Sequence, residues 1–517
     1  MHKSWFRFLI IILLTLGVLF RFANLDKKIY WHDENFTSLR VSGYTESEMV
    51  KQVFNGQVID VKDLQKYRYP NPDKIFLDTI NSLAMEEPQH PPLYYVMVRF
   101  WMQLFGNQVA ITRSLSALIS LLAFPCIYWL CLELFNSALA GWIAVVLIAV
   151  SPFHVLYAQE AREYSLWTVT ILASSTALLR ALRLNTISSW ALYVVTIVIS
   201  LYTFLFSGLV MIWQGLYVLT RERFKFSKVT TTYLLASLVG LLTYVPWILA
   251  IINNFSELDQ RTSWTSDKIP FLSLVKTWVA NPTRIFFDIN LDSKSHLIFI
   301  VIPLLILWGL IGYSIYFLCR KASKPVVVFI LALIGVTVLT LILPDLIIGG
   351  RRSSVSRYLI PSYLGIQLAV AYLFSLKLAN PSFSGYRIWQ FGFVLLIIGG
   401  IASCGVSSQA ETWWIKKNRF DTPENVQIIN QFSRPLLVSS NNRYNPGEIL
   451  TLSYLLDPKV KLQLVTEPNL PKIPEGFSDI LIFNPSKVLR RKLETEENYT
   501  IKSVDPKNLQ IFKLIKT

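Results

Sequence analysis

Long apolar stretches recur along most of this chain and alternate with short polar connections. Most of these stretches approach the ~20 residues that an α-helix needs to cross a hydrocarbon layer about 30 Å thick. We predict eleven spans, at residues 5–22, 111–132, 139–155, 166–182, 190–206, 208–219, 233–252, 296–318, 325–343, 358–376 and 389–404. The pattern therefore predicts a polytopic α-helical membrane protein.

The basic residues of the connections predict how the spans are oriented. Short loops rich in Lys and Arg stay in the cytoplasm, and one side of the predicted bundle collects such residues: Lys3, Arg7, Arg180, Arg183, Arg221, Arg223, Lys225, Lys228, Arg320, Lys321, Lys324, Lys377 and Arg387. The first span lacks a small-x-small cleavage site, so we interpret it as a retained anchor. The segments expected on the extracytoplasmic side are 24–109, 157–163, 253–295, 344–357 and the tail after residue 405.

The segment 91–105 is apolar but short, and its second half contains Arg99 and Gln103. Treating it as a span would invert every later loop and place the basic clusters outside. We therefore predict an amphipathic helix at the outer membrane interface.

Beyond residue 405 the pattern becomes mixed and typical of a water-soluble fold. Residues 424–432 have helical periodicity, and 435–440, 461–465, 479–483 and 509–514 have the pattern of short strands. We predict a membrane domain at 1–405, with a large first external loop at 24–110, and a small extracytoplasmic α/β domain at 406–517.

Composition supports a membrane protein and argues against nucleic acid as a partner. Hydrophobic residues make up 53% of the chain, and its mean hydropathy is +0.44. The net charge of +16 is spread over helix ends and loops instead of forming one basic face. The four cysteines lie in or beside apolar runs without a CxxC pair, so we expect them to be core residues.

An acidic pair, Asp33 and Glu34, follows the first predicted span in "YWHDENF". A carboxylate at the mouth of a membrane domain is suited to act as general base on an acceptor hydroxyl. The structural alternative is an acidic turn that caps a short helix beginning near Asn35.

His90 stands before two prolines in "EEPQHPPLYY". The prolines keep it out of a helical conformation and start the interfacial helix. His90 is a candidate phosphate contact, and a plain turn is the alternative. The spacing of His32, Asp33, Glu34 and His90 does not specify a metal site, so no metal is expected.

Two further polar clusters lie beside predicted spans on the same outer side. In "YAQEAREYSLW", Glu160, Arg162, Glu163 and Tyr164 stand close to hydrocarbon, where a charge usually faces a cavity or a partner. An internal salt bridge of the arginine with either glutamate is the alternative.

In "GGRRSSVSRYLIPSY", Arg357 and Tyr358 follow Arg351 and Arg352. A guanidinium group matches phosphate oxygens, and snorkelling toward lipid headgroups is the alternative. All four clusters fall on the face that the cytoplasmic loops independently assign to the outside.

The ordered motifs "RFANLDKKIYWHDE", "HPPLYY", "SP…YAQEAREYSL" and "SRYLIP" resemble the C-type glycosyltransferase superfamily. The similar branch is the bacterial one related to protein O-mannosyltransferases and lipid A aminoarabinose transferases. The resemblance covers roughly residues 16–366 and implies the fold of that superfamily.

The resemblance also implies an activity at an inner or plasma membrane: an inverting transfer from a polyprenyl-phosphate sugar donor, on the extracytoplasmic side, to a lipid, glycan or protein acceptor. It implies Asp33 as the base, with Glu34 beside it. Several relatives have a second acidic residue near the position of Tyr164, and here Glu160 and Glu163 stand close by. Because lipid phosphate is a competent leaving group, the chemistry requires a base and cations but neither a cofactor nor a metal.

Two other functions fit a polytopic chain with outer arginines. A transporter or flippase of lipid-linked sugars is the leading alternative, although such proteins often have internal repeats and charges at mid-membrane depth, which this sequence lacks. An accessory role in a cell-envelope complex is the third.

Overall fold

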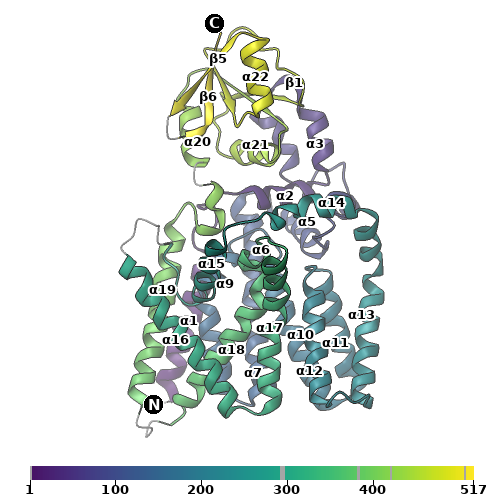
Figure 1. The fold of residues 1–517 in the computed structure, drawn as a ribbon, viewed down its shortest axis with the longest axis vertical. Helices are drawn as coiled ribbons and strands as arrows, with labels where there is room; N and C mark the ends of the chain where they lie inside the picture. The colour runs from purple at the N-terminus through teal and green to yellow at the C-terminus, as the bar shows by residue number, and fades with distance from the viewer. Residues whose placement is uncertain (1–2, 291–296, 381–384, 420–421, 506–507, 517) are drawn as a thin grey trace. The chain divides into compact units, whose positions relative to one another are not determined.

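The computed structural model describes residues 3–290, 297–380, 385–419, 422–505 and 508–516. The chain forms two compact units, many of whose elements are labelled in Figure 1. Unit 1 comprises Met1–Leu25, Glu87–Tyr94 and Arg113–Gln409, and unit 2 comprises Asp26–Glu86, Tyr95–Thr112 and Ala410–Thr517. The chain passes between the units within α5 (Leu93–Phe105) and α6 (Val109–Leu121).

Unit 1 is helical in its described residues. Its helices are α1 (Lys3–Phe22), α7 (Ala123–Phe135), α8 (Ala138–Ala149), α9 (Pro152–Ala158), α10 (Tyr164–Leu184), α11 (Ile187–Leu201), α12 (Ser207–Arg221), α13 (Lys228–Asn253), α14 (Phe255–Thr262), α15 (Phe271–Thr283), α16 (Leu297–Lys321), α17 (Lys324–Ile347), α18 (Ile360–Lys377) and α19 (Tyr386–Gln409), with α6 joining them. α10 and α18 are buried along most of their length, whereas α13 and α16 expose many apolar side chains. Helices of the second kind are typical of contact with lipid.

The described part of the chain contains seven helices that are long and apolar enough to cross a membrane, and eight if the bent pair α8–α9 is one span. α1 and α11 add shorter apolar helices. Each of the eleven predicted spans coincides with helical structure, although residue 296 lies outside the described residues. The membrane fold is therefore confirmed, while the number of spans stays a prediction.

Unit 2 combines helices with one mixed sheet. Its elements are α2 (His32–Ser42), α3 (Glu46–Val53), β1 (Asn55–Asp60), α4 (Phe76–Glu86), α20 (Thr422–Asn430), β2 (Pro435–Ser440), α21 (Asn445–Ser453), β3 (Lys461–Val465), β4 (Asp479–Phe483), α22 (Lys487–Thr495), β5 (Tyr499–Asp505) and β6 (Asn508–Lys516), besides most of α5. The strand order is β1-β3-β2-β4-β6-β5. β2 pairs in parallel with β3 and β4, and the outer pairings are antiparallel.

The residues of β2 alternate between two cores because successive side chains of a strand point to opposite faces. Leu437 lies in a cluster with Phe36 and Leu39 of α2. Leu436 lies in a second cluster with Leu489 of α22. The sheet is therefore covered on both faces, which explains why β2 is buried throughout.

The predicted tail strands 435–440, 461–465 and 479–483 are confirmed with the same bounds, and 509–514 lies within β6. β5 and β1 were not predicted. β1 belongs to the first loop, yet it pairs with β3, Val58 opposite Gln463. β1 lies at the edge of the sheet, where every one of its residues is at least partly exposed, and its sequence NGQVID is largely polar. It therefore lacks the alternation of apolar and polar residues that predicts a strand. The division at 405/406 stays a prediction about domains.

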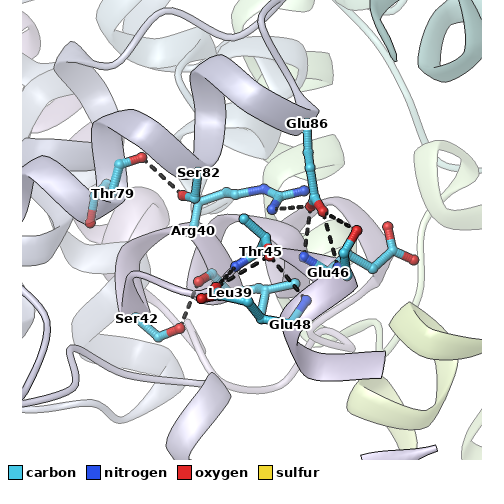
Figure 2. A network of polar contacts seen from close by, with 10 residues as sticks. Leu39, Arg40, Ser42, Thr45, Glu46, Glu48, Thr79, Ser82 and Glu86 are labelled. Atoms are coloured by element: carbon cyan, nitrogen blue, oxygen red, sulfur yellow. Dashed lines mark hydrogen bonds and ion pairs between the residues drawn. The ribbon is translucent and has the colours of Figure 1, made fainter. Parts of the chain in front are cut away.

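A buried ion pair organises the helical part of unit 2. The Arg40 guanidinium lies 2.6 Å from the Glu86 carboxylate, and neither group is more than 8% exposed. The same carboxylate accepts hydrogen bonds from the backbone N–H groups of Glu46 and Ser47 at the start of α3. Figure 2 shows how Glu86 joins α2, α3 and α4 in this way.

These contacts keep Glu86 ionised. Burial raises the pKa of its carboxyl, but Arg40 and the hydrogen bonds from Ser47 and Glu46 outweigh burial, so the pKa lies below its usual value. A carboxyl with a lowered pKa in the folded state contributes stability above its unfolded pKa and loses that contribution as pH falls through the folded pKa.

We expect Glu86→Gln to destabilise unit 2 at neutral pH by about 3 kcal/mol or more, because it removes the charge that compensates buried Arg40. The destabilisation should shrink as pH falls through the range in which Glu86 protonates. Thermal unfolding in detergent across that pH range measures both effects.

Glu48→Gln is the matched control. Glu48 belongs to the same network but is 42% exposed beside Lys74, and such pairs contribute at most about 1 kcal/mol. Glutamine also preserves the capping box with Thr45. Equal effects of the two substitutions would show that burial of the Arg40–Glu86 pair does not decide the stability of this unit.

Candidate active site

The helix that leads to the candidate site is broken. α8 ends at Ala149, α9 begins at Pro152, and the two are bent by 60°. Ser151 caps α9 through a 3.5 Å hydrogen bond from the His154 backbone N–H. A break in a membrane helix frees backbone carbonyls, and these need partners because hydrocarbon offers none.

Arg21 of α1 is a partner for two of the carbonyls at this break, those of Ile148 and Ala149. The Ile148 carbonyl also accepts a 3.3 Å hydrogen bond from the Ser151 N–H. The fully buried Arg21 guanidinium donates to the carbonyls of Ile148 at 3.0 Å and Ala149 at 2.8 Å. It also donates to the hydroxyl of Ser120 at 3.0 Å. Gly17 permits this approach, since a Cβ there would lie 2.8 Å from the Ala149 carbonyl oxygen. Through Arg21, α1 therefore donates hydrogen bonds to the backbone carbonyls at the C-terminal end of α8, where the break begins.

The other end of α9 is tied to α1 as well. The Gln159 side chain donates to the carbonyls of Phe20 at 2.7 Å and Ala23 at 2.9 Å. Arg21 and Gln159 together fix the direction of α9 and of the loop that follows it. Neither residue was predicted from the sequence, although an arginine inside the apolar run 5–22 was a visible signal.

We expect Arg21→Met to destabilise the protein, because the Ala149 carbonyl loses the hydrogen bond from Arg21, and a buried carbonyl that loses its partner costs about 1–3 kcal/mol. Arg21→Lys should be milder, since an ammonium keeps donors in the same place. The midpoint of thermal unfolding in detergent measures the difference. Thr15→Val is the control, because Thr15 is an exposed residue of the same helix whose hydroxyl donates to the Ile11 carbonyl. If Arg21→Met lowered the unfolding midpoint no more than Thr15→Val does, the role of Arg21 at the break would be contradicted.

The loop after α9 carries a compact charged cluster with His90. His90 Nδ1 lies 2.9 Å from a Glu163 carboxylate oxygen, and Arg162 Nη2 lies 3.1 Å from His90 Nε2. Arg162 Nε and Glu163 Oε2 form an ion pair at 3.3 Å. Because arginine only donates, these contacts fit a ring that donates through Nδ1 and accepts at Nε2. His90, Arg162 and Glu163 thus form one connected group.

Glu163 lies just before α10 and is fully buried. Burial raises the pKa of its carboxyl, but Arg162 and His90 outweigh burial and bring the pKa down to about 2. Glu163 is therefore ionised at neutral pH and orients its two neighbours. The internal salt bridge that the sequence left open as an alternative for Arg162 is present.

Aromatic rings adjoin this charged group. The Arg357 guanidinium lies 5.6 Å from the centre of the Tyr164 ring and 5.7 Å from that of Tyr358. Arg162 lies 5.9 Å from the centre of the Tyr164 ring, so two arginines lie near this ring. Phe206 contacts Tyr358 at a ring distance of 4.9 Å. Arginines within about 6 Å of ring faces are held by cation–π attraction.

Glu160 is 1% exposed in the same loop, and its backbone carbonyl accepts a 2.8 Å hydrogen bond from the Arg162 N–H. The structure therefore brings together the predicted residues of unit 1: His90, Glu160, Arg162, Glu163, Tyr164, Arg357 and Tyr358.

The neighbouring arginines of the "GGRRSSVSRY" motif have other partners. Arg352 forms an ion pair with Asp345 at 3.2 Å and donates to the Ser266 hydroxyl at 2.6 Å. Arg351 lies 5.7 Å from the Trp264 ring. For Arg352, the compensation expected from a lipid phosphate is supplied by the chain itself.

The predicted acidic pair lies in unit 2, in the first turn of α2. Glu34 and Lys416 form an ion pair at 3.0 Å in which both side chains are fully buried. Lys416 also donates to the Ile29 carbonyl at 2.8 Å. Asp33, one residue earlier, is half-buried. Glu34 thus joins the first loop to the tail, a contact between residues too distant in sequence to be predicted.

A metal site does not emerge from the part of the chain that the structure describes. There, no group of three or more His, Cys, Asp or Glu side chains is arranged to hold an ion. The charged group of unit 1 instead combines cations, ring faces and a fixed carboxylate, which is chemistry that suits an anionic, oxygen-rich ligand.

Comparisons with known proteins agree with this fold. Residues 89–249 match the family model described as dolichyl-phosphate-mannose-protein mannosyltransferase. No curated protein sequence matches the chain. Solved structures do: ArnT from Cupriavidus metallidurans bound to undecaprenyl phosphate is 11% identical with a TM-score of 0.54, and the apo state is 12% identical with 0.55. Each match covers 100% of this chain and 99% of the other.

The apo oligosaccharyltransferase of Archaeoglobus fulgidus is 12% identical, with a TM-score of 0.50 over 100% of this chain and 75% of the other. These proteins are C-type glycosyltransferases. The resemblance inferred from the sequence motifs is confirmed at the level of the fold, and the family match spans His90 and the loop from Gln159 to Tyr164.

Proposed function

We propose that this chain, which has the fold of the C-type membrane glycosyltransferases, transfers a sugar from a polyprenyl-phosphate donor to an acceptor hydroxyl with inversion. The observation that carries the proposal is the group of His90, Arg162 and Glu163, in which Arg162 and Glu163 are buried, together with Arg357, whose guanidinium lies near the same Tyr164 ring as that of Arg162. Most of this group falls in the segment that matches the mannosyltransferase family model. ArnT, of similar fold, was solved with undecaprenyl phosphate.

In the proposed reaction the phosphate of the donor lies against the Arg357 guanidinium. The fork of an arginine matches two phosphate oxygens. Cation–π attraction to the rings of Tyr164 and Tyr358 helps to hold the Arg357 guanidinium in place. Arg162 is held by Glu163 and His90, and its guanidinium lies 5.9 Å from the centre of the same Tyr164 ring. These cations stabilise the negative charge that grows on the phosphate as the sugar departs.

Asp33 is the proposed base. The acceptor oxygen attacks the anomeric carbon, its proton passes to the Asp33 carboxylate, and the bond from the anomeric carbon to the phosphate oxygen breaks. Polyprenyl phosphate leaves with the electron pair, so one displacement inverts the anomeric centre. Glu34 is less suited, because its carboxylate is buried against Lys416, whereas Asp33 is half-buried.

The reaction is proposed for the extracytoplasmic side of an inner or plasma membrane. The clustering of Lys and Arg in the short loops on one side of the predicted topology supports that assignment. The acceptor is proposed to be a lipid, glycan or protein hydroxyl. No cofactor takes part in the proposed displacement, because the lipid phosphate is itself the leaving group.

We expect Asp33→Asn to lower kcat by ~10²-fold or more, because it removes the proton acceptor while keeping the shape of the side chain. Sugar transfer by the reconstituted protein measures this, and unchanged donor binding and thermal stability confirm that the loss is chemical. Glu34→Gln is the companion variant. It should lower stability, because it leaves Lys416 buried without its carboxylate.

If Asp33→Asn turned over at the wild-type rate while a folded Glu34→Gln was inactive, the base would be Glu34. If both variants stayed active, the acidic pair would be the cap of α2 and the proposed mechanism would fail.

We expect Arg357→Lys to weaken donor binding measurably, since lysine keeps the charge but loses the two-pronged fork that matches phosphate oxygens. Titration with undecaprenyl phosphate, followed by native mass spectrometry, measures the affinity. Arg351→Lys is the control, as this arginine lies against Trp264 instead. Equal affinities of wild type and Arg357→Lys would remove Arg357 from the donor site.

A further inference from the structure

The sheet of unit 2 changes its winding direction at β2. The chain runs from β2 through α21 to the parallel strand β3 on one side, whereas β4 pairs in parallel with β2 on the other side. α21 packs on the face of the sheet that holds Leu437, and α22 packs on the opposite face with Leu436. In open α/β sheets, ligands bind outside the carboxyl ends of the strands at such a switch. The carboxyl ends of β2 and β4 therefore form a candidate binding edge.

This edge is polar and held by its own hydrogen bonds. Asn445 follows β2 and Asn484 follows β4, and the two exchange hydrogen bonds. The Asn484 side-chain amide donates to Asn445 Oδ1 at 2.7 Å, and the Asn445 amide donates to the Asn484 backbone carbonyl at 3.1 Å. After β3, the Glu467 backbone N–H donates to Asn441 Oδ1 at 3.0 Å. The loop between Asn441 and Asn445 is thus fixed at both of its ends.

The middle of that loop is presented to the surface. Asn442 is half-buried, Arg443 is exposed, and Tyr444 is 50% exposed. The Tyr444 ring lies edge-on to the His32 ring, with 5.6 Å between the ring centres. We call His32, Asn442, Arg443 and Tyr444 the strand-end site.

Helix α2 brings the proposed base to the same edge. A Cβ at Gly447 would lie 2.5 Å from His32 Nδ1, so the first turns of α2 and α21 are in close contact. One turn later, the Asn35 side chain donates to the Thr451 hydroxyl at 2.6 Å. The two helices therefore run side by side in the same direction. Asp33 directly follows His32 in this first turn, next to the strand-end site.

We propose that the strand-end site binds a saccharide and that a hydroxyl of this saccharide is the acceptor. A saccharide offers apolar C–H faces together with hydroxyls that both donate and accept hydrogen bonds. The half-exposed Tyr444 ring suits the C–H faces, and the Asn442 amide and the Arg443 guanidinium suit the hydroxyls. The role as acceptor rests on the proposed function, in which Asp33 is the base, whereas binding of the saccharide does not.

Saccharide binding in the absence of any donor tests the site. The full chain in nanodiscs is titrated with mannotetraose, chitotetraose or tetragalacturonate, and binding is followed by saturation-transfer NMR. Tyr444→Ala removes the ring. Arg443→Gly removes the guanidinium without straining the backbone, because Arg443 has a φ of 49°, a left-handed conformation that glycine adopts readily. Leu455→Ala is the matched control, since Leu455 is 46% exposed just beyond the opposite end of α21.

At least one of the three saccharides should bind wild type and Leu455→Ala with equal affinity. The same saccharide should bind Tyr444→Ala and Arg443→Gly ~10-fold or more weakly, because each variant loses one contact of the site. No binding of any of the three to wild type, or equal binding to wild type and both site variants, would overturn the proposal. If Tyr444→Ala failed to fold, Arg443→Gly would decide alone.

Two further readings separate this inference from the proposed reaction. Undecaprenyl phosphate, titrated in parallel, should bind all four proteins equally, and a wild type that bound the saccharide but no undecaprenyl phosphate would contradict the proposed reaction alone. When a polyprenyl-phosphate sugar that wild type consumes is then added, the bound saccharide should grow by one sugar. A bound saccharide that never grew while that donor was consumed would overturn its role as the acceptor.

Discussion

Backbone carbonyls freed inside a membrane domain must find partners within the protein, and the break between α8 and α9 is where this constraint is strongest. Arg21 meets it by donating to Ile148 and Ala149 from α1. The Val150 carbonyl lies 3.5 Å from the Cys404 sulfur of α19. Two helices distant in sequence thus converge on one bend, and Gly17 and Gly400 allow their close approach.

The candidate site follows from that bend. α9 leaves the break in a fixed direction, and Gln159 ties its end back to α1. The next residues, Glu160 to Tyr164, are buried as a consequence, and burial is what makes the contacts among Arg162, Glu163 and His90 strong. The loop at residues 160–164 is thus held in place by the fold, and it positions the Arg162 guanidinium and the Tyr164 ring.

The sequence predicted much of this arrangement and missed the parts that depend on distant contacts. The length of the apolar stretches predicted the helices, and the pattern of residues within each short segment predicted β2, β3 and β4. Both kinds of prediction succeed because they use only residues that are neighbours in the sequence. β1 was missed since its strand character comes only from pairing with β3, some 400 residues later in the chain. The Glu34–Lys416 pair was missed for the same reason.

Among the predicted site residues, charge next to hydrocarbon was the informative signal. It led to Arg162, Glu163 and Arg357, which the structure brings together around Tyr164. For Arg352 the same reasoning left a lipid phosphate or snorkelling toward headgroups as the alternatives, but Asp345 of the same chain is its counter-ion. A sequence shows that a charge needs compensation without showing whether the partner is a ligand or another residue of the fold.

Consumption of a lipid-linked donor tests the central claim most directly. The purified protein, reconstituted in liposomes, is incubated with a panel of polyprenyl-phosphate sugars and an extract of envelope lipids and glycans as acceptors, and free polyprenyl phosphate is measured. The account predicts that at least one donor is consumed with an equal release of polyprenyl phosphate. Movement of intact donors between leaflets without any release of polyprenyl phosphate would contradict it and identify a transporter instead.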